Sequence, residues 1–172
     1  MELFQVPDNR SVIYVGEERA QLESWLTVHR ETLLVKCNGL DEAQMKQRPI
    51  ATSDLSLLGL IRHMTYVEQV WFERIFTGVD VIEYYKRPDD RDADFHDLDE
   101  LSMLEVLANF EHAIEVSDDC ARGQDLATTS TSQWRHRHVD LRWIYLHMIE
   151  EYARHNGHAD IIRELIDGVT GD

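Results

Sequence analysis

Apolar residues recur at intervals of three and four along four stretches of the chain. This spacing is typical of an amphipathic helix, which buries one stripe of its surface. The four predicted helices run from about 17 to 37, 57 to 77, 101 to 122 and 141 to 166. No segment alternates apolar and polar positions for long enough to predict a strand. We therefore expect an all-α protein, an antiparallel four-helix bundle that forms a single domain over residues 1–172.

Residues that favour helix ends lie beside these stretches. Glycines follow the first three, where a left-handed residue commonly ends a helix: Gly39, Gly78 and Gly123. Ser56 is one of several N-cap candidates before the second helix, Asp99 or Ser102 can cap the third, and Asp140 can cap the fourth. Between the first two helices we expect one short helical turn before Pro49. Residues 1–15 are expected to be a lead-in segment and not a core strand.

Two polar residues interrupt the apolar stripe of the last helix. Glu151 and His155 are four positions apart, so their side chains are neighbours on the face that is otherwise apolar. A carboxylate that faces a core is costly unless it is paired or bound to a cation. A Glu and a His side by side on an inward face offer two ligands to a divalent metal ion. The stripe itself comprises Leu141, Ile144, Met148, Tyr152, Ala159, Ile162 and Ile166.

The last helix offers more than one pair of ligands. His147, Glu151, His155 and His158 form a ladder on one face, and eight residues of helix rise about 12 Å, so one ion cannot span 147 to 155. One adjacent pair must act, with a third ligand from another helix. His63 is the best candidate because it is the only histidine of the second helix, although a histidine on the flank of a helix is more often structural.

The pattern of ligands bears on the kind of metal centre. The sequence H-E-x-x-H is absent, and three residues after Glu151 stands Arg154, so the E-x-x-H pairs of di-iron bundles are absent too. We therefore expect one ion and not two. Two imidazoles and one carboxylate with an open position suit catalytic zinc, with nickel, iron and manganese as alternatives.

The connectors contain two charged clusters. Residues 89–100 include seven carboxylates but lack the glycine and terminal glutamate of a calcium loop, so we expect a solvated acidic loop with an exposed His96. Residues 134–138, Trp-Arg-His-Arg-His, form the only basic cluster of the chain. This cluster either offsets nearby carboxylates or binds an anionic group at the mouth of the bundle, and the first interpretation is the more common for a charged loop.

Composition excludes some classes of partner. The 172 residues include 17 Lys and Arg and 33 Asp and Glu, a net charge of −16, so the surface repels nucleic acid. No signal peptide is visible at the N-terminus, and no apolar run approaches the roughly 18 residues of a membrane span. Cys37 and Cys120 lack metal or redox spacing and are expected to be reduced thiols of a cytoplasmic chain, without a catalytic role.

Three segments together resemble a known family: IRHMTYVEQVWFERIFTG, WRHRHVDLRW and above all HMIEEYARHNGHAD. They look like the DinB-like superfamily, in its actinobacterial branch, and the resemblance covers the chain from about Gly16 to the end. Members are four-helix bundles, often dimers, that hold one metal ion. The resemblance assigns the ligands to His63, Glu151 and His155. Many members have histidine in place of Glu151, but mycothiol-dependent maleylpyruvate isomerase is similar in using His, Glu and His for zinc.

The same resemblance implies thiol chemistry. It predicts a transferase that joins mycothiol or a similar low-molecular-weight thiol to an electrophile, with the metal activating the thiol. His158 stands where many members have glutamine, so it is expected, with His147 and Arg154, to lie behind the ligands or to face the substrate. Arg135, Arg137 or Arg154 can receive an anionic part of a substrate. The alternatives are a non-catalytic dimeric metal-binding stress-response protein and a metal-assisted hydrolase.

Overall fold

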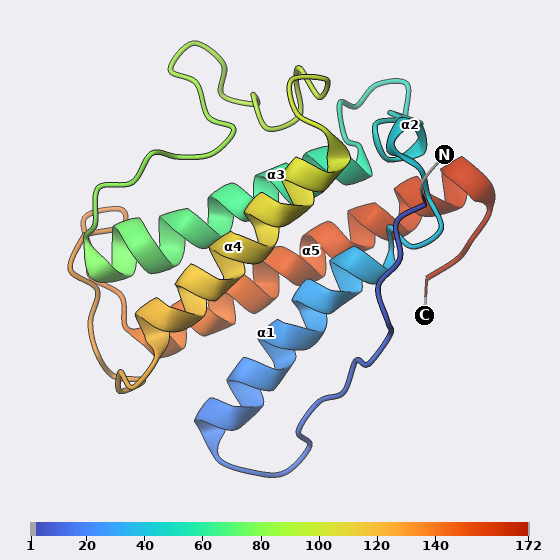
Figure 1. Cartoon of the computed structure of the whole chain (residues 1–172). Coiled ribbons are helices and arrows are strands. Elements are labelled where there is room, and N and C mark those ends of the chain that lie inside the picture. The colour runs from blue at the N-terminus through green and yellow to red at the C-terminus, as the bar shows by residue number, and fades with distance from the viewer. Residues whose placement is uncertain (1–2, 172) are drawn as a thin grey trace.

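The described residues, 3–171 of the computed structural model, are helical and contain no strand beyond isolated bridges (Figure 1). The elements are α1 (Glu18–Val35), α2 (Glu42–Met45), α3 (Leu57–Glu68), η1 (Gln69–Thr77), α4 (Met103–Ala121) and α5 (Leu141–Asp167). The prediction of an all-α protein is confirmed, and the four long helical stretches lie within a few residues of their expected bounds. The short turn expected before Pro49 is α2. No helix within residues 3–171 is both long and apolar enough to cross a membrane.

Side-chain caps explain where the helices begin. Ser56 accepts a hydrogen bond from the backbone N–H of Gly59, and Asp140 accepts one from Trp143. Of the two candidates before α4, Ser102 is the cap, and its exchange of hydrogen bonds with Glu105 forms a capping box. These caps satisfy N–H groups that have no partner within the first turn of a helix.

The second predicted helix is continuous but changes its geometry halfway. Its first part, α3, is α-helical, whereas η1 is a π-helix of nine residues that ends at Gly78 in the left-handed region (φ 76°). A π-helix closes its hydrogen bonds one residue further along than an α-helix, and such segments are frequent at functional sites. The apolar periodicity of the sequence predicts the helix but not this change.

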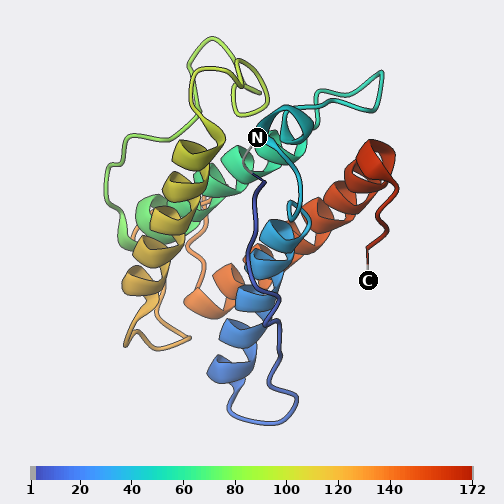
Figure 2. The same cartoon turned by 45° about the vertical axis from the view of Figure 1, so that its right-hand side comes forward.

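The helices do not alternate strictly in direction (Figures 1 and 2). The starts of α1 and α5 meet where Arg142 pairs with Glu18, and their later parts meet where Arg163 donates to the carbonyl of Lys36 at 2.9 Å, so the two run in parallel. α3 and α5 run antiparallel. α4 runs parallel to α3, because the connector 78–102 returns the chain to the end of the bundle where α3 begins.

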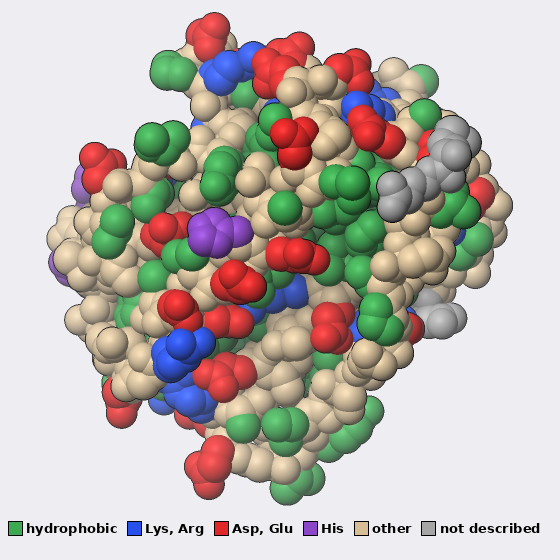
Figure 3. Space-filling view, viewed as in Figure 1, with side chains coloured by type: hydrophobic (Ala, Val, Ile, Leu, Met, Phe, Trp, Pro, Cys, Tyr) green, Lys and Arg blue, Asp and Glu red, His purple; other side chains and the backbone are tan. Residues whose placement is uncertain are grey.

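The connector 78–102 packs along α3 and is not uniformly solvated. Arg62 donates to the carbonyls of His96 at 2.8 Å and Ala93 at 3.0 Å, and Ala93 is buried. The expectation of a solvated acidic loop is therefore wrong for its middle part, where Asp94 is fully buried. His96 is only half-buried and pairs with Asp90. Elsewhere acidic side chains are scattered over the surface, as Figure 3 shows above α1 and α4.

A buried polar network lies within the apolar core and joins three helices. Arg30 of α1 donates two hydrogen bonds of 2.7 Å to the carboxylate of Glu68 on α3, and the hydroxyl of Tyr152 on α5 donates a third of 2.7 Å. Glu68 is fully buried, so each of its contacts is screened little by water. Because Tyr152 follows Glu151 directly, this network fixes the height of α5 against α3, which are the helices that carry the candidate ligands.

Candidate metal centre

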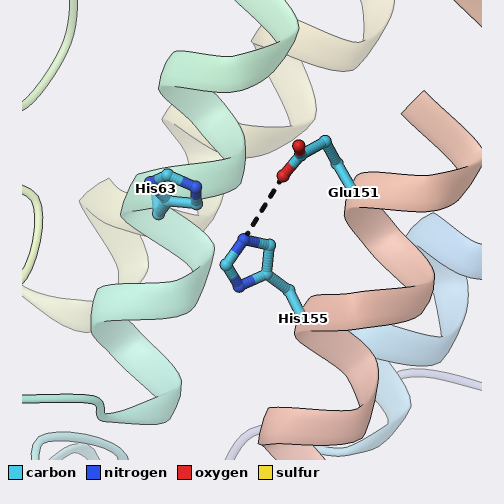
Figure 4. Close-up of side chains that lie close together, drawn as sticks. All are labelled: His63, Glu151 and His155. Carbon is cyan, nitrogen blue, oxygen red and sulfur yellow. Dashed lines mark ion pairs between the residues drawn. The ribbon is translucent and has the colours of Figure 1, made fainter. Parts of the chain in front are cut away.

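Three candidate ligands from two helices converge in the structure. His63 projects from α3 towards Glu151 and His155 of α5, as Figure 4 shows. One ligand atom of each residue lies within 4.8 Å of the other two. The convergence follows from the antiparallel contact of α3 with α5 and from the four-residue spacing of the two ligands on α5. We call these residues the His63–Glu151–His155 cluster.

The separation of Glu151 and His155 suits two ligands of one metal ion better than an ion pair. Glu151 Oε2 and His155 Nε2 are 3.6 Å apart, too far for a hydrogen bond. Two ligands about 2.0–2.1 Å from a tetrahedral zinc ion lie roughly 3.4 Å apart, close to that separation. The side chains of His63, Glu151 and His155 are 21%, 15% and 12% exposed. The carboxylate and the two imidazoles are thus mostly buried and are not hydrogen-bonded to one another. They form a suitable donor set for a divalent ion.

Asp94 holds the first ligand from behind. Its Oδ2 lies 2.6 Å from Nδ1 of His63 and 2.9 Å from Nζ of Lys86, and its side chain is 1% exposed. With Nδ1 engaged by a carboxylate, Nε2 of His63 is left for a ligand role. Metal-binding histidines commonly donate their second N–H to such a partner, which fixes the orientation of the ring. Asp94 is a candidate supporting residue that the sequence does not single out, because its acidic neighbours in the connector predict solvent exposure for all of them.

An aromatic contact fixes the other side of the same ring. Phe95 stacks on His63 with ring centroids 5.5 Å apart. Gly59 permits this packing, because a Cβ at that position would lie 2.7 Å from the Phe95 ring. Two consecutive residues of the connector, Asp94 and Phe95, therefore position His63.

Electrostatics prepares His155 for metal binding. Burial, followed by the nearby His63 and His158, lowers the pKa of His155 to about 3. The imidazole is therefore uncharged near neutral pH, which is the form that binds metals. Burial works to raise the pKa of Asp94, but hydrogen bonds from His63 and Lys86 outweigh it and the pKa is lowered. The supporting carboxylate is thus ionised where the ligand needs a negative partner.

The alternative pair on α5 is also brought together. His147 Nε2 lies 3.6 Å from Glu151, and its Nδ1 lies 3.4 Å from Glu150. His147, Glu150 and Glu151 could hold an ion as well, but all come from one helix, and Glu150 is 55% exposed. Arg154 forms ion pairs with both glutamates. The cluster with His63 is less exposed and joins two helices, so we favour it.

His158 lies beside the cluster and not in it. Its Nδ1 is 3.4 Å from Nδ1 of His155, with the two rings nearly perpendicular. The ring is therefore placed behind a ligand, as the sequence leads one to expect of a supporting residue. Its role stays a prediction, as do those of His147 and Arg154.

A pocket of about 680 Å³ opens beside the cluster and includes His63 and Glu151 in its wall. Its other lining residues are Tyr66, Val67, Val70, Trp71, Arg74, Arg91, Trp134, Arg135, Trp143, His147, Glu150 and Arg154. Of the basic cluster at 134–138, Trp134 and Arg135 line both this pocket and a neighbouring hollow, whereas Arg137 and His138 line only the neighbouring hollow. The sequence drew attention to the arginines but not to the three tryptophans that meet here from η1, the loop and α5.

The fold and the cluster define a helical bundle with a candidate mononuclear metal centre, next to a pocket large enough for a small molecule. A family model for mycothiol S-transferases matches residues 21–168. The chain therefore belongs to the mycothiol S-transferase family, which confirms the resemblance to the DinB-like superfamily in its actinobacterial branch. Comparison with curated proteins gives no match.

Proposed function

We propose that the protein joins a mycothiol-like thiol, through its sulfur, to an electrophilic small molecule, with the help of one divalent metal ion. The observation that carries this proposal is the His63–Glu151–His155 cluster, two residues of which line a pocket, in a chain of the mycothiol S-transferase family. A bound zinc ion would supply Lewis acidity that keeps a thiol deprotonated at neutral pH. Thiolates, and not thiols, are the reactive nucleophiles.

Each of the three proposed ligands would have a distinct role at this metal centre. His63 would bind through Nε2, held by Asp94 and Phe95, and His155 would bind as an uncharged imidazole. Glu151 would add one negative charge, which keeps more electron density on the thiol sulfur than a third histidine would. Two imidazoles with one carboxylate match known catalytic zinc sites, so we propose zinc ahead of nickel, iron or manganese.

A histidine of the pocket would accept the proton that the thiol loses. His147 lines the pocket and lies beside Glu151, so its imidazole is placed to accept the proton of the thiol. The thiol would lose its proton, its sulfur would form a bond to the electrophilic carbon, and the leaving group would depart with the electrons of the bond that breaks.

The cysteines of the protein do not compete for this role. Cys37 is fully buried, which raises the pKa of its thiol to about 12, and burial also raises the pKa of Cys120. Neither has a disulfide partner. The nucleophilic sulfur must therefore come from a cosubstrate, in a compartment that keeps thiols reduced, which we propose to be the cytoplasm.

Metal content and conjugation together test the proposal. After loading with zinc and removal of excess metal, we expect one ion per chain in the wild type and in His112→Ala, a control on the exposed surface of α4. We expect no ion in His63→Ala, Glu151→Ala and His155→Ala. Conjugation of mycothiol to 1-chloro-2,4-dinitrobenzene, followed by absorbance, should be lost in the same three variants.

Two results would contradict the proposal. One is a wild-type protein that stays free of metal after zinc loading. The other is conjugation that proceeds at the wild-type rate in the variants without metal. Product formed equally well without any thiol would indicate hydrolysis instead, because a metal-activated water needs no thiol.

A further inference from the structure

The pocket beside the cluster has an aromatic wall. Trp71 lies at its centre, with its ring 5.1 Å from Trp134, 5.2 Å from Trp143 and 4.3 Å from His147. The chain has four tryptophans, and three of them line this one pocket. Trp143 is 39% exposed, so part of an indole surface is open to a ligand. Trp71 is 4% exposed, so a further flat ring can stack only on the open parts of Trp134 and Trp143.

The same pocket is basic in a strongly acidic protein. Four arginines and two glutamates line it, so these groups sum to 4 − 2 = +2, against −16 for the whole chain. Arg74 pairs with Glu83, and Arg154 pairs with Glu150 and Glu151.

The other two arginines of the wall, Arg91 and Arg135, form no ion pair with a carboxylate among residues 3–171. Arg91 and Arg135 are exposed, and two guanidinium groups without a carboxylate partner, in a chain with an excess of carboxylates, are free to bind an anionic ligand.

A tight turn sets the position of Arg135. Trp134 and Arg137 exchange two backbone hydrogen bonds of 2.8 and 3.0 Å, and Arg135 and His136 between them have φ values of 48° and 65°. This is the geometry of a two-residue hairpin turn, which non-glycine residues adopt at some cost. The guanidinium of Arg135 lies 5.4 Å from the Trp134 ring. The charge is therefore held next to the aromatic wall before any ligand arrives.

The loop that carries this turn is tied to the helix that carries Trp71. The backbone N–H of Thr131 donates to the carbonyl of Phe76 at 2.8 Å, and that of Ser132 donates to Ile75 at 3.0 Å. Both acceptors lie in η1. The walls of the pocket are thus joined by backbone hydrogen bonds, so that the site is largely formed in the free protein.

From these features we infer that the pocket selects an electrophile that is a planar aromatic acid. Its ring lies against Trp134 and Trp143, which pack on the buried Trp71. Its carboxylate or sulfonate is bound by Arg91 and Arg135, and its reactive carbon points to the end of the pocket formed by His63 and Glu151. The role of electrophile rests on the proposed function, whereas binding of the aromatic acid does not.

The lining matches the chemistry of such an acid. Its charged donors are arginines, and its largest apolar surfaces are indole rings. Guanidinium groups beside indole rings suit a flat ring with an anionic substituent, since arginine binds carboxylates through two parallel hydrogen bonds.

Calorimetric titration with three probes tests the inference. We expect 2-naphthoate to bind the zinc-loaded protein about tenfold more tightly than neutral 2-naphthylmethanol, the difference that one charge-assisted hydrogen bond makes. We expect a similar advantage over cyclohexanecarboxylate, which keeps the charge but cannot stack. The affinity for 2-naphthoate should persist after removal of zinc with EDTA, because arginines and not the metal hold the carboxylate.

Matched variants locate the site. Arg91→Gln with Arg135→Gln should weaken 2-naphthoate binding at least about tenfold and leave 2-naphthylmethanol binding unchanged, and Trp143→Leu should weaken both about fivefold. Arg122→Gln and Trp25→Leu, which lie outside the pocket, should have no effect.

Three outcomes would overturn the inference: equal affinity for the acid and the alcohol, full 2-naphthoate affinity in the double arginine variant, or binding of methyl glucoside in place of 2-naphthoate. Because the titration needs neither thiol nor turnover, a failure here leaves the metal and conjugation results intact, and the reverse is also true.

Discussion

Asp94 provides the sharpest test of how the chain builds its candidate metal centre. Its carboxylate is 1% exposed and lies 2.6 Å from Nδ1 of His63, so it is buried against the ring of a ligand. Carboxylates in this position typically contribute 10- to 100-fold to metal affinity, or about 1.4 to 2.7 kcal/mol. Asp94→Asn keeps an acceptor but removes the charge, so we expect zinc affinity to fall by about tenfold, and by more in Asp94→Ala.

Two controls separate the effect on the ligand from other effects. Asp90→Asn makes the same change at a similar contact of 2.7 Å, to His96 in the same connector, but His96 is not in the cluster, so zinc affinity should not change. Lys86→Met removes the other partner of Asp94 and leaves the contact with His63, so affinity should stay within about twofold of the wild type.

Zinc affinity can be measured by competition with a chromophoric chelator at neutral pH. Urea unfolding of the metal-free variants checks that the fold is intact, and the visible absorption of bound cobalt reports the geometry of the ligands. An Asp94→Asn protein that is folded and binds zinc within twofold of the wild type would refute the reasoning, because the buried carboxylate would then be supporting the connector and not the ligand.

Three further predictions concern stability. Gly78→Ala should destabilise the protein by at least about 1 kcal/mol more than Gly123→Ala in urea unfolding. Both glycines have φ above 70°, but of the two only Gly78 is placed so that a Cβ would meet another residue, at 2.7 Å. Equal losses of stability in the two variants would contradict this. Glu68→Gln should cost about 3–5 kcal/mol, since it leaves the buried charge of Arg30 short of its main partner, and a loss below 1 kcal/mol would count against it. The pKa of His155 is lowered to about 3 in the folded protein. As the pH falls, this imidazole is therefore protonated in the unfolded chain before it is protonated in the folded one. The contribution of this group to the stability of the metal-free protein should therefore be complete above pH 6.5 and fall by up to about 1.4 kcal/mol per pH unit between 6.5 and 3, a slope that His155→Gln should reduce.

Local patterns were sufficient to predict the helices and to place Glu151 and His155 on one face of α5. Apolar spacing defines a helix from a few neighbouring residues, and Ser56, Ser102 and Asp140 each act as a cap within one turn of their own positions. Glu151 and His155 were identified for the same reason, because a four-residue spacing fixes two side chains on one face whatever the rest of the fold does.

Contacts between distant segments were not predictable in this way. The contact of His63 with Asp94 joins residues 31 positions apart, and it exists only because the connector folds back along α3. Among seven acidic residues between 89 and 100, no spacing distinguishes the one that is buried. The aromatic wall depends likewise on Trp71, Trp134 and Trp143 meeting from three separate segments, and no helical or strand period relates them.

The buried network explains why the ligands nevertheless converge before a metal arrives. Glu68 lies five residues after His63 on the same helical stretch, and Tyr152 lies between the two ligands of α5. The hydrogen bond between Glu68 and Tyr152 therefore sets the register of α3 against α5 within one turn of the cluster. A shift of one helical turn would move His63 by about 5.4 Å from its partners, which is more than the separation of their ligand atoms. Burying the charges of Arg30 and Glu68 in an apolar core costs free energy, and their hydrogen bonds with each other and with Tyr152 offset this cost. The same hydrogen bonds hold His63 opposite Glu151 in the candidate metal centre.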